Sequence, residues 1–244
     1  MSSFVNFNNR LPDPTFGVNI SGAVEGSGDR GPGFASVSVK SNRPAQVSRT
    51  NSGKGIHRDT GSHFWQISIK YHPMLREQFD VVSSFLDSRN GRIRPFFVVL
   101  PQHSRPRNPA FATLAQTRSI RTVGTSLPGA DEMLLTTNTT FSDAIIPMRG
   151  DFFNIQDPND VNHLKAYKVV AVETNTTYQI GKQPATNQVR IHFMPPLTRS
   201  VAANSVIKWI DPEFRVIASS DVSEYDLSTD NLYQFGLDLE EILP

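Results

Sequence analysis

The residues between His57 and Ser62 have types that could support acid, base or phosphoryl-transfer chemistry. Asp59-Thr60-Gly61-Ser62 matches the tetrapeptide of aspartic proteases, in which two such carboxylates share a proton. The preceding His57 and Arg58 do not form the apolar strand that presents this aspartate, and no second Asp-Thr-Gly or Asp-Ser-Gly occurs. His57-Arg58-Asp59 also matches part of a kinase catalytic loop, but the Gly-rich loop, the strand lysine and the metal-binding Asp-Phe-Gly are missing. We interpret the segment as a turn before a strand.

The other short motifs do not combine into a catalytic, cofactor-binding or metal-binding constellation. Two glycine-rich stretches, Ser27 to Gly31 and Ser52 to Gly55, lack the spacing of a phosphate-binding loop. Arg149-Gly150-Asp151 resembles an integrin-binding tripeptide, and we interpret it as a tight turn that leads into a strand. No two histidines are three or four residues apart on an expected helix, which argues against a zinc site; they are His57, His63, His72, His103, His163 and His192. We therefore predict no enzyme activity, no cofactor and no metal.

Composition limits the partners and the compartment. The chain has 244 residues, and its 24 Lys and Arg nearly balance 23 Asp and Glu, so no net field favours an obligatory nucleic acid or anionic membrane partner. Cysteine is absent, which excludes disulfides and thiolate chemistry and fits a reducing cytoplasm or a particle assembled there. No basic segment followed by an apolar one opens the chain, and no run approaches the roughly 18 apolar residues of a membrane span, so we expect a soluble, unexported protein without a membrane.

The stretch from Phe64 to Pro101 has the pattern of a strand, a helix and a second strand. In residues 64–71 apolar and polar side chains alternate, which is typical of a half-buried strand, and Pro95 to Pro101 is a nearly continuous apolar run. Between them, Pro73 suits a first helical turn and Asn90-Gly91 a helix end, around an apolar stripe at helical period. We predict that the core of this domain is formed by Trp65, Ile67, Ile69, Leu75, Phe79, Val82, Leu86 and Phe97.

The remaining patterns predict a mainly β chain with one packed helix. Residues 1–34 hold few apolar residues and read as an N-terminal arm or loop, and short strands are expected near 35–40 and 46–50. Periodicity disappears after Pro101, and short strands near 133–135, 148–155, 165–172 and 188–193 predict a small inserted β domain. Residues 214–218 and 233–239 then return to the first sheet, connected by 225–231. The predicted domains are 35–103 with 211–244, and an insert over 104–210 of sandwich-like or barrel-like type.

The order of these elements resembles bacteriophage distal tail proteins and related baseplate hub proteins. The tryptophan-led strand, the helix ending in Phe85-Leu86 and Asn90-Gly91-Arg92, and the strand Pro95-Phe96-Phe97-Val98 carry the resemblance. The resemblance covers about residues 35–220. Its later motifs are Met148 to Phe153, Ala166 to Val170, Ile191 to Leu197 and Asp211 to Arg215. The N-terminal residues before 35 do not align, and one hypothesis is that they clasp a neighbouring subunit.

The resemblance implies a split β-barrel related to the tail-tube fold, with a helix packed against it and a second β domain inserted. It implies a structural virion protein that assembles in the host cytoplasm as a homohexameric ring at the distal end of the tail tube. The partners would be the tail tube protein, the baseplate hub protein and fibre or wedge proteins, with DNA only in transit through the lumen. The strand faces carrying Gln66, Ser68 and Lys70, or Arg215, would face either the channel or a neighbour, and the insert would point outward.

Two other classes of protein stay open at this point. A carbohydrate-binding module of a tail or receptor-binding protein is the first, because a small β domain with Trp209 could hold a sugar by stacking and hydrogen bonds. Glycan binding by the insert would favour this class. The second is a hydrolase whose site is dispersed in the sequence, which would lose a measured activity when one carboxylate is changed and the fold survives.

Overall fold

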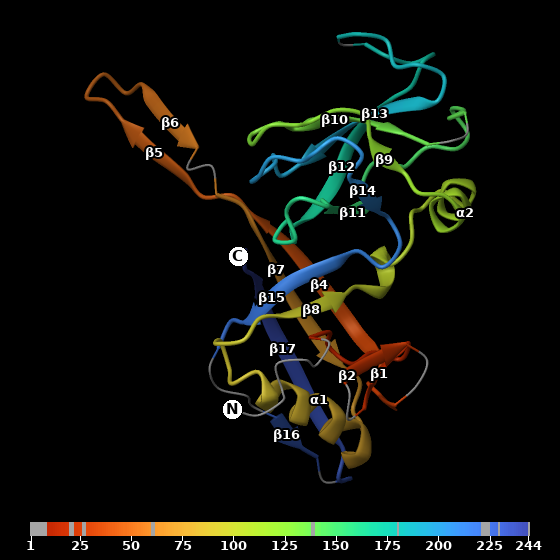
Figure 1. Cartoon of the computed structure of the whole chain (residues 1–244). Helices are drawn as coiled ribbons and strands as arrows, with labels where there is room; N and C mark the ends of the chain where they lie inside the picture. Colours follow the sequence, from red (N-terminus) through yellow and green to blue (C-terminus); the bar gives the residue numbers. More distant parts are fainter. Residues whose placement is uncertain are drawn as a thin grey trace. The chain divides into compact units, whose positions relative to one another are not determined.

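The chain folds into two compact units, and the mainly β fold class is confirmed (Figure 1). The computed structural model describes residues 9–19, 22–25, 28–59, 62–137, 140–179, 181–220, 225–228 and 230–243. The first unit comprises Met1–Val98 and Arg215–Ile242, and the second comprises Val99–Phe214 and Leu243–Pro244. No helix in the described ranges is long and apolar enough to cross a membrane.

The first unit is built on a curled sheet that forms half of a barrel. Its strands lie in the order β4 (Phe34–Asn42), β7 (Phe64–Tyr71), β17 (Tyr233–Glu241), β15 (Glu213–Ala218) and β8 (Phe96–Val99). The short β16 (Tyr225–Leu227) adds to β17. Along β7 the side chains alternate between the core and the other face, as the sequence pattern predicts, because successive residues of a strand point to opposite faces.

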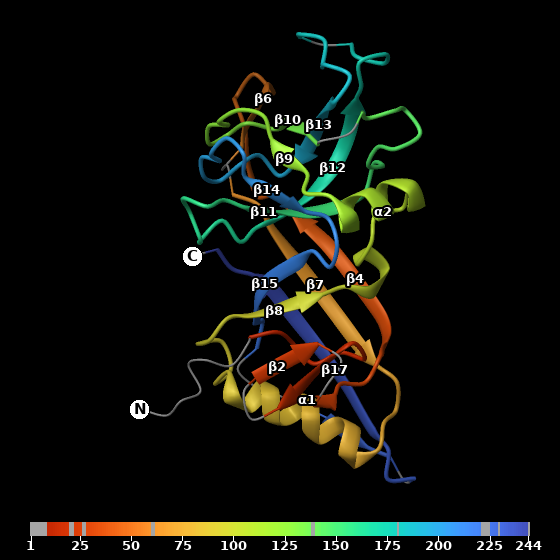
Figure 2. The same ribbon diagram turned by 45° about the vertical axis from the view of Figure 1, so that its right-hand side comes forward.

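Helix α1 (Arg76–Ser88) lies against one face of this sheet, as both ribbon views show (Figures 1 and 2). It buries Phe79, Val82, Phe85 and Leu86, which recur at helical spacing. The ring of Phe79 stacks on Tyr233 of β17 at 4.6 Å, and Phe85 meets Phe96 of β8 edge to face at 5.5 Å. The helix ends where Asn90 and Gly91 take positive φ values, which breaks the helical hydrogen-bond pattern.

The N-terminal residues are anchored in the first unit. Leu11 is buried, and its N–H donates to the carbonyl of Phe97 at 2.8 Å, so residues 9–11 run beside β8. Arg10 forms a buried ion pair of 2.8 Å with Asp13 and lies 3.5 Å from the centre of the Phe16 ring. Burial alone would raise the pKa of Asp13, but hydrogen bonds from Thr15 and Arg10 outweigh it and hold this pKa below its ordinary value.

Three short strands follow, where the sequence predicted an arm or loop. They are β1 (Phe16–Asn19), β2 (Gly22–Glu25) and β3 (Asp29–Arg30), in the order β2-β1-β3. Strands of two to four residues are too short for an alternating pattern to stand out. Gly31 permits the close approach of this region to the preceding turn, because a Cβ there would lie 2.3 Å from the carbonyl oxygen of Pro12.

The second unit is a closed antiparallel barrel with the strand order β10-β13-β12-β11-β14-β9. The strands are β9 (Arg121–Thr122), β10 (Glu132–Thr136), β11 (Phe152–Gln156), β12 (Ala166–Glu173), β13 (Gln188–Met194) and β14 (Val206–Lys208). Aromatic side chains fill the barrel: the rings of Tyr167, Phe193 and Trp209 lie within 5.7 Å of the Phe153 ring, centre to centre.

A second helix, α2 (Pro109–Thr117), belongs to this unit, where the sequence predicted short strands only. Its start carries the usual signals, since the Asn108 side chain accepts a hydrogen bond from the N–H of Ala110 and Pro109 occupies the first turn. The buried Phe111 packs edge to face on Trp209 at 5.0 Å. A short 3₁₀ helix, η2 (Pro101–His103), follows β8.

Candidate interaction surfaces

The chemical motifs do not gather into a site. Thr60 and Gly61 lie outside the described residues, and Asp59 ends a strand whose neighbours His57 and Arg58 are exposed. Asp151 of the Arg-Gly-Asp tripeptide is buried, and its carboxylate accepts hydrogen bonds from the N–H groups of Arg107 and Met148 at 3.0 and 2.8 Å. Because this carboxylate closes a tight turn in the barrel, it is not available to an outside partner.

One histidine, His163, lies in the core of the second unit. His163 is buried, and its Nε2 lies 2.8 Å from the hydroxyl of Tyr167. Burial lowers the pKa of His163, and the nearby carboxylates of Asp160 and Asp157 offset this only in part. In the described part of the chain, no group of three His, Asp or Glu side chains has an arrangement that could hold a metal ion.

Trp209, the side chain considered for sugar stacking, is not at the surface. It is 2% exposed and lies between Phe111 and Phe153 in the barrel core. A ring in this position cannot stack on a bound sugar without unfolding the barrel.

The predicted core residues of the first unit fall into three groups. Leu75 is 61% exposed, which corrects its assignment to the core. Helix α1 begins only at Arg76, with Leu75 as an extended N-cap, so Leu75 lies outside the helical stripe. Phe97 is half-buried, because Phe96 and Val98 take the two inward positions of β8. The other side chains are buried: Trp65, Ile67, Ile69, Phe79, Val82 and Leu86.

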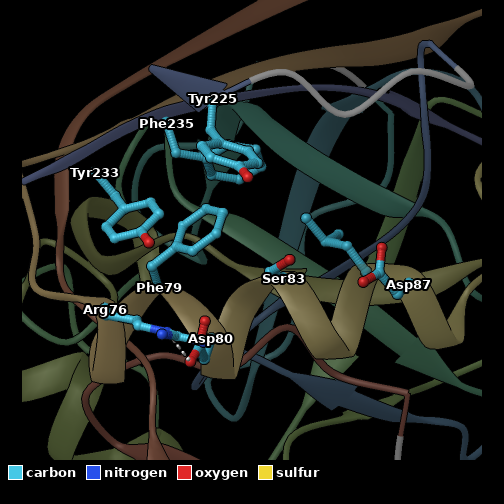
Figure 3. A pocket seen from close by; sticks show the side chains of 9 residues that line it. Arg76, Phe79, Asp80, Ser83, Asp87, Tyr225, Tyr233 and Phe235 are labelled. Atoms are coloured by element: carbon cyan, nitrogen blue, oxygen red, sulfur yellow. Dashed lines mark ion pairs between the residues drawn. The ribbon is translucent and has the colours of Figure 1, made fainter. Parts of the chain in front are cut away.

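An aromatic groove of about 400 Å³ runs along α1 (Figure 3). We call it the α1 groove; it is lined by Arg76, Phe79, Asp80, Ser83, Leu86, Asp87, Tyr225, Tyr233 and Phe235. The ring of Phe79 lies 4.9 Å from Tyr225 and 4.6 Å from Tyr233, so three rings from α1, β16 and β17 form one wall.

Charged side chains of α1 border these aromatic rings. Arg76 and Asp80 form an exposed ion pair at 3.4 Å, and Asp87 borders the groove about two turns beyond Asp80. The groove has no signal in the sequence, because its rings come from segments about 150 residues apart and the pattern of residues 225–231 predicts a connection only.

A second candidate surface is the hairpin of β5 (Ala45–Arg49) and β6 (Gly55–Asp59), which forms a sheet of two strands only. We call it the β5–β6 hairpin. Its turn is closed by Gly53, with φ of +80°, whose N–H donates to the Thr50 carbonyl at 2.9 Å. Val47 and Ile56 are 63% and 51% exposed, although they point to opposite faces. Both faces of the hairpin are therefore open.

The third candidate surface is the outer edge of β4. In the described part of the first unit, β4 ends the sheet on one side and pairs with β7 alone. The opposite edge, β8, is covered by residues 9–11 through the hydrogen bonds of Leu11 and Asn9 with Phe97. An uncovered edge strand offers a row of backbone donors and acceptors to a partner strand.

The uncovered edge of β4 and the exposed β5–β6 hairpin are surfaces through which the first unit can associate with a partner. Residues 26–103 match the family model described as distal tail protein pb9, A domain, N-terminal. No curated protein sequence matches the chain. The resemblance to bacteriophage distal tail proteins is thus confirmed over a segment that contains β4, the β5–β6 hairpin, β7, α1 and β8. This match to a distal tail protein domain supports a structural role in a bacteriophage tail.

Proposed function

We propose that the protein forms a hexameric ring at the distal end of the tail tube. In this position it connects the tube to the baseplate hub and to peripheral fibre or wedge proteins. The observation that carries the proposal is the match of residues 26–103 to a distal tail protein A domain, because this segment contains the uncovered edge of β4.

The curled sheet of the first unit suits a ring. Its β4 edge is uncovered, and a neighbouring copy that lies over this edge in a closed ring would leave no row of unpaired backbone groups exposed. We assign ring formation to residues 35–103 and 211–244, and contacts with peripheral proteins to the insert over 104–210. The division of the chain into two compact units supports this assignment.

The charge balance suits a channel for DNA. The chain carries a formal net charge of +1, so a ring of it would hold phosphate only weakly. A strongly basic lumen would bind the DNA backbone and slow its passage. The ring would belong to the virion and assemble in the host cytoplasm.

The mass of the purified chain in solution tests this proposal. Light scattering at several concentrations should give six times the chain mass of 27.1 kDa. A stable dimer, or a monomer at every concentration and also in the presence of tail tubes, would contradict it. Glycan binding by the chain without ring formation would instead favour the carbohydrate-binding class.

A further inference from the structure

The β5–β6 hairpin has the properties of a segment that needs a partner. An isolated hairpin of two strands is at best marginally stable in water. Here every described side chain from Ala45 to Arg58 is exposed except the half-buried Thr50. The hairpin, residues 45–59, contains the three cations Arg49, Lys54 and Arg58 against the single acid Asp59. The hairpin therefore presents a basic surface with one exposed aliphatic side chain on each face.

The α1 groove has the complementary chemistry. The exposed side of α1 carries Glu77, Asp80 and Asp87 against the single cation Arg76. Tyr225, at the rim of the groove, is 55% exposed and offers its ring to a partner. A guanidinium or ammonium group is held well where an aromatic face and a carboxylate lie side by side.

The β5–β6 hairpin lies at one end of the sheet, and α1 and β16, which line the groove, lie at the other end (Figure 1). The hairpin connects the end of β4, at Asn42, to the start of β7, at Phe64. The groove lies beyond the other end of β7, at Tyr71, where Met74 forms a β-bridge with Tyr233. The eight residues of β7 separate them by about 26 Å at the usual rise of a strand. A chain therefore cannot place its own hairpin in its own groove.

We propose that the β5–β6 hairpin of one copy docks in the α1 groove of a second copy. The basic side chains of the hairpin lie between the aromatic wall and the carboxylates of Asp80 and Asp87, and an aliphatic side chain of the hairpin covers the exposed rings. Each copy uses two different patches, its hairpin toward one neighbour and its groove toward the other, so the contact repeats from copy to copy. The copies close into a ring when the rotation between neighbours divides a full turn evenly. The inference rests on the proposed ring and names the contact that joins its copies.

Charge reversal tests the electrostatic part of this contact. The change Arg49→Glu with Lys54→Glu, or Asp80→Lys with Asp87→Lys, should raise the concentration needed for half-assembly at least tenfold, measured by light scattering. The chain that carries all four changes should regain most of its assembly. The control Arg105→Glu with Arg118→Glu, at two exposed sites of the second unit, makes the same change of charge as the hairpin variant and should leave assembly unaltered. Because all these side chains are exposed, circular dichroism should show an unchanged fold.

Cross-linking tests whether the hairpin of one copy lies in the groove of the next. Because the chain has no natural cysteine, only the introduced cysteines can react. A chain with Ile56→Cys and Ser83→Cys, treated with a short bifunctional maleimide, should give a ladder of linked chains. A chain with Ile56→Cys and Arg118→Cys should give no such ladder.

The two proposals fail in different ways. The docking contact would be overturned, and the ring retained, if the charge-reversed chains form rings normally and no link forms between residues 56 and 83. The groove would then be open to another tail protein. A wild-type chain that never forms rings and gives no link would overturn both proposals.

Discussion

Replacing Leu86 and Leu75 by alanine compares one chemical change at two ends of one helix. Leu86 is 7% exposed on the buried side of α1, whereas Leu75 is 61% exposed before the first helical turn. The change Leu86→Ala removes three buried carbons, which at about 0.8 kcal/mol each gives roughly 2.4 kcal/mol of lost transfer free energy.

The cavity contribution at Leu86 should be small. Leu86 borders the α1 groove and a second surface groove beside Arg89 and Phe96, so neighbouring side chains and water can fill part of the space. We expect a loss of about 2.5–3.5 kcal/mol for Leu86→Ala, in the lower half of the range for buried leucines, and less than about 0.5 kcal/mol for Leu75→Ala.

Urea unfolding followed by tryptophan fluorescence measures both losses. Trp65 lies buried on β7, in the sheet that α1 covers, while Trp209 reports on the second unit. The transition reported by Trp65 should move to lower urea in Leu86→Ala and stay in place in Leu75→Ala. Equal shifts in the two variants, or a loss below about 1 kcal/mol for Leu86→Ala, would refute the packing assigned to α1.

Three further predictions concern buried polar groups. Burial lowers the pKa of His163 in the folded protein, so below about pH 6.5 the unfolded chain binds a proton that the folded chain does not, and stability should fall. Between pH 7.5 and pH 5.5 the melting temperature of the His163→Gln variant should therefore fall less than that of the wild type. An equal fall in the two proteins would contradict the assignment. The change Asp151→Asn should cost about 1–3 kcal/mol in urea unfolding because it weakens two backbone hydrogen bonds, whereas exposed Arg149→Ala should change stability by less than about 0.5 kcal/mol. The change Arg10→Ala leaves the buried carboxylate of Asp13 without its ion pair and should lower the free energy of unfolding by about 3–5 kcal/mol. Residues 9–19 should also be cleaved faster by a protease. Unaltered cleavage would show that other contacts hold this segment.

The strand, helix and strand between Phe64 and Val99 could be predicted because each element buries one face with a regular period. The alternation in β7 and the stripe of Phe79, Val82 and Leu86 depend on local spacing alone. Leu75 was misassigned because Pro73 suggested an earlier helix start, whereas α1 begins only at Arg76.

The α1 groove and the open surfaces could not be predicted in the same way. The groove depends on β16 and β17 returning to α1, which is a long-range contact with no local signal. Exposure of the β5–β6 hairpin on both faces is likewise a tertiary property, since its alternation would also fit a strand inside a sheet. Helix α2, in contrast, carried local signals in Asn108 and Pro109, but its nine residues are short for a clear apolar period.

Electron cryomicroscopy of the purified assembly shows how its copies are arranged. We expect closed rings of six copies, with the sheet of the first unit around a central channel and the β5–β6 hairpin of each copy against α1 of the next. Open filaments, two-fold dimers, or rings in which the second unit surrounds the channel would contradict it.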